Sequence, residues 1–298
     1  MTYAEIPLTE SIRAAIEDGW GREVEGPAER LHGGEESAAY RIGDLLVRVG
    51  PEWRSTAMAE WCNAVAEHAA SAIPEAVAPF RTRAGTTTVR ADGRPVSLWR
   101  YVAGEWPDDR DPRMRTQAAR TLARLHRALA SYRPPPRRET AFAEVGLNGD
   151  PPVEAPYLAD PDLDRWLADY AEHNPARQVL HGDFYAGNTL AHDGRLVAVL
   201  DWDEIFIGPP ELEVASAALE WSDEFGDAEQ ERRRFITDYH QAGGTAGPID
   251  DRTAAQLIRH KLRREAAYFE LARERGTEFD QDDIAYHERR VAAFFQLK

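Results

Sequence analysis

The pattern of apolar and polar positions divides the chain into a strand-rich first third and a helix-rich remainder. In the first third, short apolar runs are separated by Gly, Asp and Pro turns, which is typical of strands joined by tight connections. Strands are expected at residues 28–43, on both sides of a glycine loop, and at 45–49, 76–81, 86–91 and 96–102. Apolar residues at helical spacing predict two helices beside them, at residues 9–20, with Thr9 as N-cap, and at 54–72.

Helical patterns dominate the rest of the chain. Asp111 and Pro112 make a favourable helix start, because a capping aspartate is followed by proline at the first helical position. Apolar residues then recur on one stripe, and His126 on that stripe is expected to be a buried core histidine rather than a ligand. Further helices are expected at about residues 164–173, 228–242, 252–275 and 281–296.

One β-hairpin is predicted within this helical part. Apolar runs at residues 188–191 and 196–200 flank the turn His192-Asp-Gly-Arg195. Asp183 and Asn188 precede the first strand and Asp201 closes the second, so the hairpin is expected to bring their side chains together. Carboxylate and amide oxygens are ligands for Mg²⁺, and phosphoryl transfer needs a carboxylate to orient or deprotonate the acceptor hydroxyl.

The ordered set His181-Gly182-Asp183, Asn188 and Leu200-Asp201-Trp202-Asp203 resembles the aminoglycoside phosphotransferase and choline kinase family, the small-molecule branch of the kinase-like fold. Its spacing matches a kinase catalytic loop followed by the metal-binding aspartate. Each fragment alone is more often a turn with a capping aspartate. The complete set, with strands between its parts, carries the resemblance.

The resemblance implies an α+β, protein-kinase-like fold with two lobes. Residues 1–102 would form a nucleotide-binding lobe with an antiparallel sheet and a helix. Residues 103–298 would form a mainly helical lobe that holds the catalytic hairpin and binds the acceptor. The cofactors implied are ATP and Mg²⁺.

The resemblance also assigns roles to the hairpin residues. Asp183 would orient or deprotonate the acceptor hydroxyl, and Asn188 and Asp201 would hold the metal. His181 would support the catalytic loop, and Asp203 would help to shape the acceptor side.

Nucleotide contacts are implied for the first lobe. Gly33, Gly34 and Ser37 are candidates for covering the triphosphate, since a glycine pair lets the backbone approach phosphates closely. The backbone around Arg100 to Val102 would be the hinge that meets adenine. The alternatives are an ordinary hairpin loop and a plain edge strand.

The chain departs from the family pattern at two places. It has no lysine before Lys261, so Arg48 takes the place of the strand lysine that binds phosphates, with Glu60 as its expected partner. Glu60 is alternatively a solvated surface charge. The family's G-D-P-x-x-D-L-A segment reads G-P-P-E-L-E-V-A here, and Glu213 is expected to brace the catalytic loop in place of the aspartate, while Pro209 replaces an acidic residue.

Composition limits the kinds of binding partner and the cellular location expected for the protein. The net charge of −16 argues against nucleic acid and is compatible with a cationic acceptor. The apolar runs are too short to cross a bilayer, and the N-terminus has no basic segment of a signal peptide. A single cysteine, Cys62, fits a reducing cytoplasm, where it is expected to be a packed thiol. Oligomeric state is not readable from the sequence.

Acidic residues of the last third are candidates for binding a cationic acceptor, with helix caps and solvated faces as the alternative. They are Glu220, Asp223, Glu224, Asp280, Asp282 and Asp283.

The function predicted from the sequence is transfer of the ATP γ-phosphoryl group to a hydroxyl of a small molecule, such as an aminoglycoside-like antibiotic or another cationic acceptor. One alternative is a metabolic or biosynthetic kinase acting on choline, a sugar, homoserine or a natural product. Another is a non-catalytic nucleotide-binding pseudokinase, which Arg48 and the altered segment before Glu213 would suggest.

Overall fold

The computed structural model describes residues 5–24, 26–31, 36–144, 155–173, 176–222, 228–274 and 276–298. The chain forms two compact units. The first consists of Met1–Gly104 with Pro134–Glu139, and the second of Glu105–Arg133 with Thr140–Lys298.

The first unit contains a five-stranded sheet in the order β1-β2-β3-β5-β4, in which every neighbouring pair is antiparallel. The strands are β1 (Glu29–Leu31), β2 (Ala38–Ile42), β3 (Leu45–Val49), β4 (Thr88–Ala91) and β5 (Arg94–Arg100). Left-handed Asp92 and Gly93, with φ of 48° and 72°, close the β4–β5 hairpin predicted from the sequence.

The prediction of a strand at residues 76–81 is wrong. Only isolated bridges form there, at Ala76 and between Pro79 and Trp99, and the Phe80 N–H donates to the Leu98 carbonyl at 2.7 Å. Proline has no N–H for a β-ladder, so Pro79 prevents the segment from pairing along its length.

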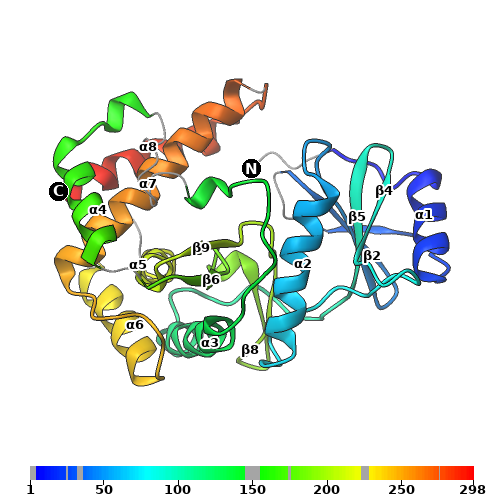
Figure 1. Cartoon of the computed structure of the whole chain (residues 1–298), viewed down its shortest axis with the longest axis horizontal. Helices are drawn as coiled ribbons and strands as arrows, with labels where there is room; N and C mark the ends of the chain where they lie inside the picture. Colours follow the sequence, from blue (N-terminus) through cyan, green and yellow to red (C-terminus); the bar gives the residue numbers. More distant parts are fainter. Residues whose placement is uncertain are drawn as a thin grey trace. The chain divides into compact units, whose positions relative to one another are not determined.

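Two helices flank this sheet (Figure 1). α1 (Glu10–Trp20) begins where the Thr9 side chain accepts a hydrogen bond from the Ile12 N–H at 3.2 Å. α2 (Thr56–Ala70) is capped in the same way by Ser55 and contains the buried Cys62. Ile12 and Ile16 of α1 pack with inward residues of β3 and β5, and this packing forms the core of the unit.

The segment Pro134–Glu139 is held against α2 by side-chain contacts. The Trp61 indole N–H donates to the Pro135 carbonyl at 2.9 Å, and the Arg137 guanidinium lies 4.0 Å from the Trp61 ring centre. Ser55 donates to Glu139 at 2.6 Å. Trp61 is therefore the main anchor of a segment that is distant in sequence.

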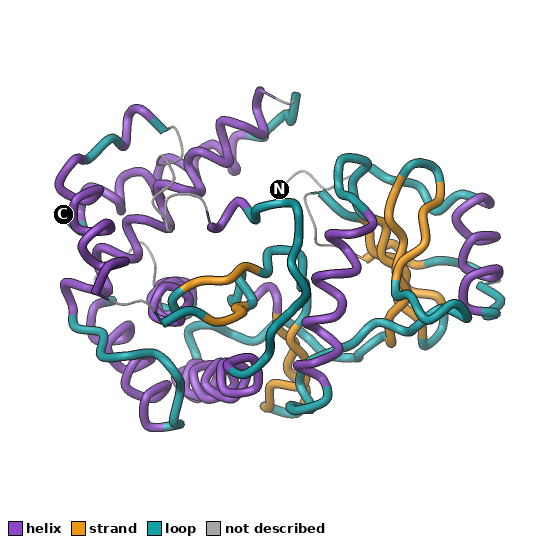
Figure 2. Tube along the Cα trace, in the orientation of Figure 1, coloured by secondary structure: helices purple, strands orange, loops and turns teal. Residues whose placement is uncertain are grey.

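The second unit is mostly helical (Figure 2). Its helices are α3 (Pro112–Ala130), α4 (Pro161–His173), α5 (Pro210–Glu220), α6 (Glu229–Gln241), α7 (Asp251–Glu274) and α8 (Gln281–Gln296), with short 3₁₀ turns η1 (Phe142–Glu144), η2 (Pro156–Leu158) and η3 (Ala186–Asn188). α3 starts as predicted, with Asp111 accepting from the Arg113 N–H at 2.8 Å. α4 starts earlier than predicted because Asp160 caps it through the Asp162 and Leu163 N–H groups.

Two small antiparallel pairs complete the second unit. β6 (Gln178–Leu180) pairs with β9 (Phe206–Gly208), and β7 (Thr189–His192) pairs with β8 (Arg195–Val199). The β7–β8 pair is the predicted hairpin, and its turn has left-handed Asp193 and Gly194. Glu105 and Ala191 exchange both backbone hydrogen bonds, which ties the start of the unit to the hairpin. Within the described residues, no helix has the length and apolar character that crossing a membrane requires.

Replacing Trp61 by Phe should destabilise the first unit by about 1–2 kcal/mol, because the Pro135 carbonyl loses its donor and the cation–π contact weakens. Chemical denaturation and limited proteolysis near residues 134–139 measure this effect. Trp53→Phe is the matched control, since Trp53 is 59% exposed. Equal stability of the two variants would contradict the anchoring role.

Candidate active site

The loop from His181 to Asn188 follows β6 and leads through η3 into the hairpin. Gly182 has a φ of +93°, and a Cβ at this position would lie 2.0 Å from the Glu204 carbonyl oxygen. Only glycine fits this backbone conformation and this contact. The close approach brings the loop carrying Asp183 against the segment that carries Asp201, Asp203 and Glu204.

His181 makes a second link between these two segments. Its ring is fully buried, and Nε2 lies 2.9 Å from the Leu200 carbonyl oxygen, so Nε2 carries the proton. The other nitrogen, Nδ1, then accepts the Asp183 N–H at 3.4 Å. Burial lowers the pKa of His181, which keeps the ring neutral at neutral pH. His181 thus fixes the backbone at Asp183 relative to the residue before Asp201.

Asn188 orients the Asp183 carboxylate. Its side-chain NH₂ donates to the Asp183 carbonyl at 3.0 Å and to Oδ2 of the same residue at 2.7 Å. Because the amide nitrogen faces Asp183, the amide oxygen of Asn188 points away from it. The Leu200 N–H donates to the Asn188 carbonyl at 2.8 Å, so Asn188 lies beside the end of β8.

Asp201 lies in the left-handed region, with a φ of +54°, and its carboxylate accepts the Asp203 N–H at 3.3 Å. Burial raises the pKa of Asp183 to about 7; nearby Lys261 opposes this shift, while Glu220, Asp201 and Glu204 add to it. The carboxylates of Asp183 and Asp201 are thus close enough to repel each other. A bound cation would relieve that repulsion.

The donor set fits a hard divalent cation such as Mg²⁺. Asp183, Asn188 and Asp201 offer only oxygen atoms. In the part of the chain that the structure describes, no three His, Cys, Asp or Glu residues are arranged to hold a metal ion.

Glu213 on α5 binds the backbone of the loop that carries Asp183. Its carboxylate accepts the backbone N–H of His181 at 3.1 Å and of Gly182 at 2.5 Å. It also bonds His126 Nε2 at 2.8 Å, and its side chain is 2% exposed. Burial alone would raise the pKa of Glu213, but His126 and these N–H donors lower it, so the carboxylate stays charged. These bonds are the ones expected of a residue that braces the loop.

Tyr239 on α6 is linked to Glu213 through His126, a role that sequence analysis did not predict. Its hydroxyl accepts the N–H groups of Thr245 at 2.9 Å and Ala246 at 3.1 Å. Its own proton must then go to His126 Nδ1, 2.7 Å away, which leaves the His126 proton on Nε2, facing Glu213. His126 is a buried histidine, as predicted, and it carries a directed hydrogen-bond chain from α6 to the catalytic loop. An aromatic residue on a helical stripe gives no sequence signal for this role.

The nucleotide candidates lie in the first unit. Gly33 and Gly34 fall outside the described residues, and Ser37 is buried just before β2. Arg48 is half-buried in β3, opposite Ser97 of β5.

The remaining first-unit candidates lie on α2 and at the end of β5. The Glu60 carboxylate accepts the Thr87 N–H at 2.8 Å, and Glu67 pairs with Arg81 at 2.6 Å. Arg100 is the exposed last residue of β5, and Val102 follows it.

Three of the six acidic residues considered for a cationic acceptor have other roles. Asp280 and Asp283 form a reciprocal capping box at the start of α8, and Asp282 is exposed in its first turn. Glu220 is paired with Lys261 and Arg290. The other two, Asp223 and Glu224, lie outside the described residues.

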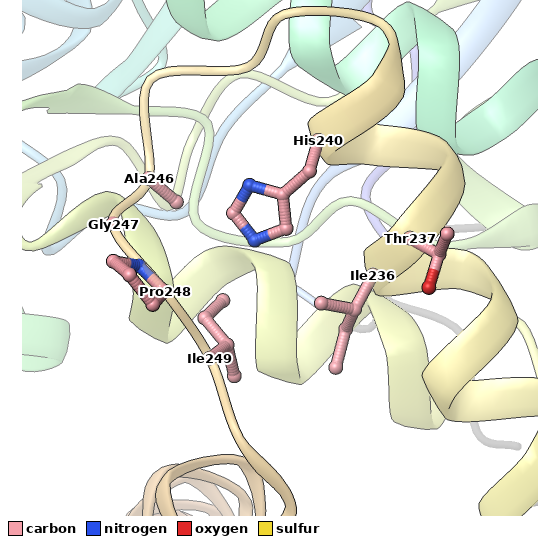
Figure 3. A pocket seen from close by; sticks show the side chains of 7 residues that line it. All are labelled: Ile236, Thr237, His240, Ala246, Gly247, Pro248 and Ile249. Carbon is pink, nitrogen blue, oxygen red and sulfur yellow. The ribbon is translucent and has the colours of Figure 1, made fainter.

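A cavity of about 550 Å³ lies between α6 and the loop that follows it (Figure 3). It is lined by Ile236, Thr237, His240, Ala246, Gly247, Pro248 and Ile249. This lining is largely apolar and includes none of the residues predicted for catalysis.

Sequence and structure comparisons agree with the predicted family and fold. A family model described as the phosphotransferase enzyme family matches residues 27–256. Hygromycin-B 4-O-kinase of Escherichia coli is 32% identical over 84 residues, which are 28% of this chain and 24% of that protein. Homoserine kinase of Granulibacter bethesdensis strain ATCC BAA-1260 / CGDNIH1 is 27% identical over 155 residues, 48% of this chain and 47% of that protein. The matches thus span less than half the length of these curated relatives.

Among solved structures, the amicoumacin kinase hAmiN in complex with AMP-PNP, Ca²⁺ and Ami superposes with a TM-score of 0.67 at 11% identity. The match covers 95% of this chain and 92% of that one. The predicted α+β fold of the protein-kinase-like class is confirmed. The chain belongs to the phosphotransferase enzyme family.

Gly182→Ala should lower stability by at least about 2 kcal/mol and disrupt the catalytic loop, since a methyl group meets a backbone carbonyl in a left-handed conformation. Gly194→Ala is the control, because Gly194 also has positive φ but its Cβ would meet nothing within 4 Å. Thermal unfolding of both variants gives the comparison. A Gly182→Ala protein as stable as the control would contradict the close approach.

Tyr239→Phe should cost about 1–3 kcal/mol of stability, because the N–H groups of Thr245 and of the buried Ala246 lose their acceptor. Urea unfolding, together with hydrogen exchange at residues 245 and 246, measures the effect. Tyr157→Phe serves as the control, since Tyr157 is 44% exposed. Unchanged exchange at these two amides would show that the hydroxyl does not hold them.

Proposed function

We propose that this protein is a small-molecule kinase that transfers the γ-phosphoryl group of ATP to an acceptor hydroxyl and uses Mg²⁺. The observation that carries the proposal is the arrangement of Asp183, Asn188 and Asp201. Asn188 fixes the Asp183 carboxylate, and contacts at His181 and Gly182 fix Asp183 against the segment of Asp201. Since phosphoryl transfer depends mainly on positioning and electrostatics, such a rigid set of oxygen groups suits it.

Asp183 is the residue we assign to the acceptor hydroxyl. Its carboxylate has one oxygen bound to Asn188, which leaves the other to accept the hydroxyl proton or to orient it. Asn188 and Asp201 would hold the metal through the Asn188 amide oxygen and the Asp201 carboxylate. When bound, Mg²⁺ supplies positive charge that neutralises the phosphate oxygens. Asp203 would contribute to the acceptor side.

Residues 1–102 are proposed as the nucleotide lobe and residues 103–298 as the catalytic and acceptor lobe. The antiparallel sheet with α2 supports this assignment. The residues proposed to contact nucleotide, or to support those contacts, are Gly33, Gly34, Ser37, Arg48, Glu60, Arg100 and Val102.

The alternative of a non-catalytic nucleotide-binding protein rested on Arg48 and on the altered segment before Glu213. Glu213 makes both backbone bonds to the catalytic loop, so the altered segment no longer favours that alternative. A catalytic role is also supported by the intact set of Asp183, Asn188 and Asp201. The acceptor is a small molecule with a hydroxyl group, and the relatives include kinases named for hygromycin B and homoserine.

Asp183→Asn should lower turnover by about 10²–10⁴-fold, because the general base is removed from an otherwise intact loop. Its affinity for ATP should stay within about threefold of the wild type, since Asp183 is assigned to the acceptor. ADP release with a panel of hydroxyl acceptors and isothermal titration with ATP measure the two quantities. Asp282→Asn, at an exposed helix position, is the control. Retained turnover, or loss of ATP binding with turnover, would contradict the assignment.

A further inference from the structure

Four charged side chains form a network where α5, α7 and α8 meet. Lys261 Nζ lies 2.5 Å from Glu265 Oε1 and 3.1 Å from Glu220 Oε1. The Arg290 guanidinium binds the same two carboxylates, at 2.9 Å to Glu220 and 3.0 Å from its Nε to Glu265. The side chains of Lys261 and Arg290 are 8% and 5% exposed. Two buried cations therefore neutralise two carboxylates.

This network lies beside the catalytic loop. Phe184, the residue after Asp183, faces the Trp221 ring with 6.3 Å between ring centres, and Trp221 directly follows Glu220. The end of α5, where Glu220 binds Lys261 of α7, is thus next to the segment that holds Asp183. The pKa shifts agree with this placement: burial acts to lower the pKa of Lys261, yet Glu265, Glu220 and Asp183 raise it above its ordinary value.

The choice of lysine at this position is informative. The chain uses arginine for 34 of its 36 basic residues, and Lys261 is the buried one of its two lysines. An ammonium group is compact and has three N–H donors, whereas a guanidinium is a broad planar fork. Glu220 and Glu265 use two of these donors, and no other described residue accepts from Lys261. Among the described residues, the third N–H of Lys261 is therefore left without an acceptor.

The charge balance of this network also limits which acceptor charge is compatible with it. Glu220 and Glu265 are each bound to two cations, so they do not present uncompensated negative charge to a polycation. A positively charged group placed here would meet Lys261 and Arg290. An oxygen atom of a hydroxyl or carboxylate would instead complete the hydrogen bonding of Lys261.

We propose that Lys261 determines acceptor specificity by donating its remaining N–H to an oxygen of the acceptor. The acceptor then carries a hydroxyl or carboxylate oxygen near the reacting hydroxyl, and it is not a polycation. This inference rests on the proposed kinase function and assigns its acceptor class.

The test measures ADP release with homoserine as the carboxylate acceptor, simple sugars as polyhydroxyl acceptors, and hygromycin B and choline as cationic acceptors. The wild type should use homoserine or a sugar with the highest kcat/KM. Lys261→Arg keeps a cation between the two carboxylates but changes the donor geometry. It should raise the acceptor KM about tenfold or more, in line with the loss of a charged hydrogen bond, and leave the ATP KM within about twofold.

Matched variants separate this role from a structural one. Lys298→Met removes the other lysine, which is 63% exposed, and should leave both KM values unchanged. The double variant Lys261→Met with Glu265→Gln removes one charge of each sign, so it preserves the charge balance, and it should show the same acceptor defect. Thermal unfolding confirms that each variant is folded.

The possible outcomes distinguish the two proposals. Preference for hygromycin B or choline, or a normal acceptor KM in folded Lys261→Arg, would overturn the role of Lys261. ATP hydrolysis that depends on Asp183 but no transfer to homoserine or to any sugar would overturn the acceptor class and keep the kinase chemistry. Absence of any turnover that depends on Asp183 would overturn the proposed function itself.

Discussion

The carboxylate of Glu213 is the group on which the geometry of the catalytic loop depends. A buried negative charge is costly unless hydrogen bonds satisfy it, and here two backbone N–H groups and one imidazole N–H do so. The same bonds satisfy the N–H groups of His181 and Gly182, which have no strand partner in the loop. The loop and α5 therefore stabilise each other.

Two further contacts fix the loop of Asp183 relative to the segment of Asp201. The absence of a side chain at Gly182 lets the loop touch the carbonyl of Glu204, and His181 bonds the carbonyl of Leu200. Both contacts connect the loop of Asp183 with the segment of Asp201 through backbone atoms. The positions of the two carboxylates are thus set by the backbone. A site of this kind is organised before any ligand binds.

The departures from the family pattern have local physical explanations. Glu213 has a longer side chain than the usual aspartate, and from the first turn of α5, which begins at Pro210, it reaches both loop N–H groups. Pro209 and Pro210 lack N–H groups, so the start of that helix leaves fewer donors to be capped. The network of Lys261 and Arg290 shows a similar balance, because each buried carboxylate there is matched by cations from two helices.

The sequence by itself determined the elements whose causes are local. Alternation of apolar residues, an Asp-Gly turn and capping residues such as Thr9 and Asp111 specified the β7–β8 hairpin, α1 and α3. Motif order specified which polar residues to examine. α5 was not among the predicted helices, because it is buried on nearly all sides and so lacks the polar face that gives a helix its periodic pattern.

Strand pairing and side-chain contacts between residues far apart in the sequence were decided only by the tertiary structure. Pro79 was misread as part of a strand because pairing depends on a partner 20 residues away. The hydroxyl of Tyr239, the two carboxylates around Lys261 and the contact of Gly182 with Glu204 join positions that no short-range pattern connects. Sequence spacing therefore specified the candidate site residues, and packing of buried, mutually satisfied polar atoms fixed their geometry.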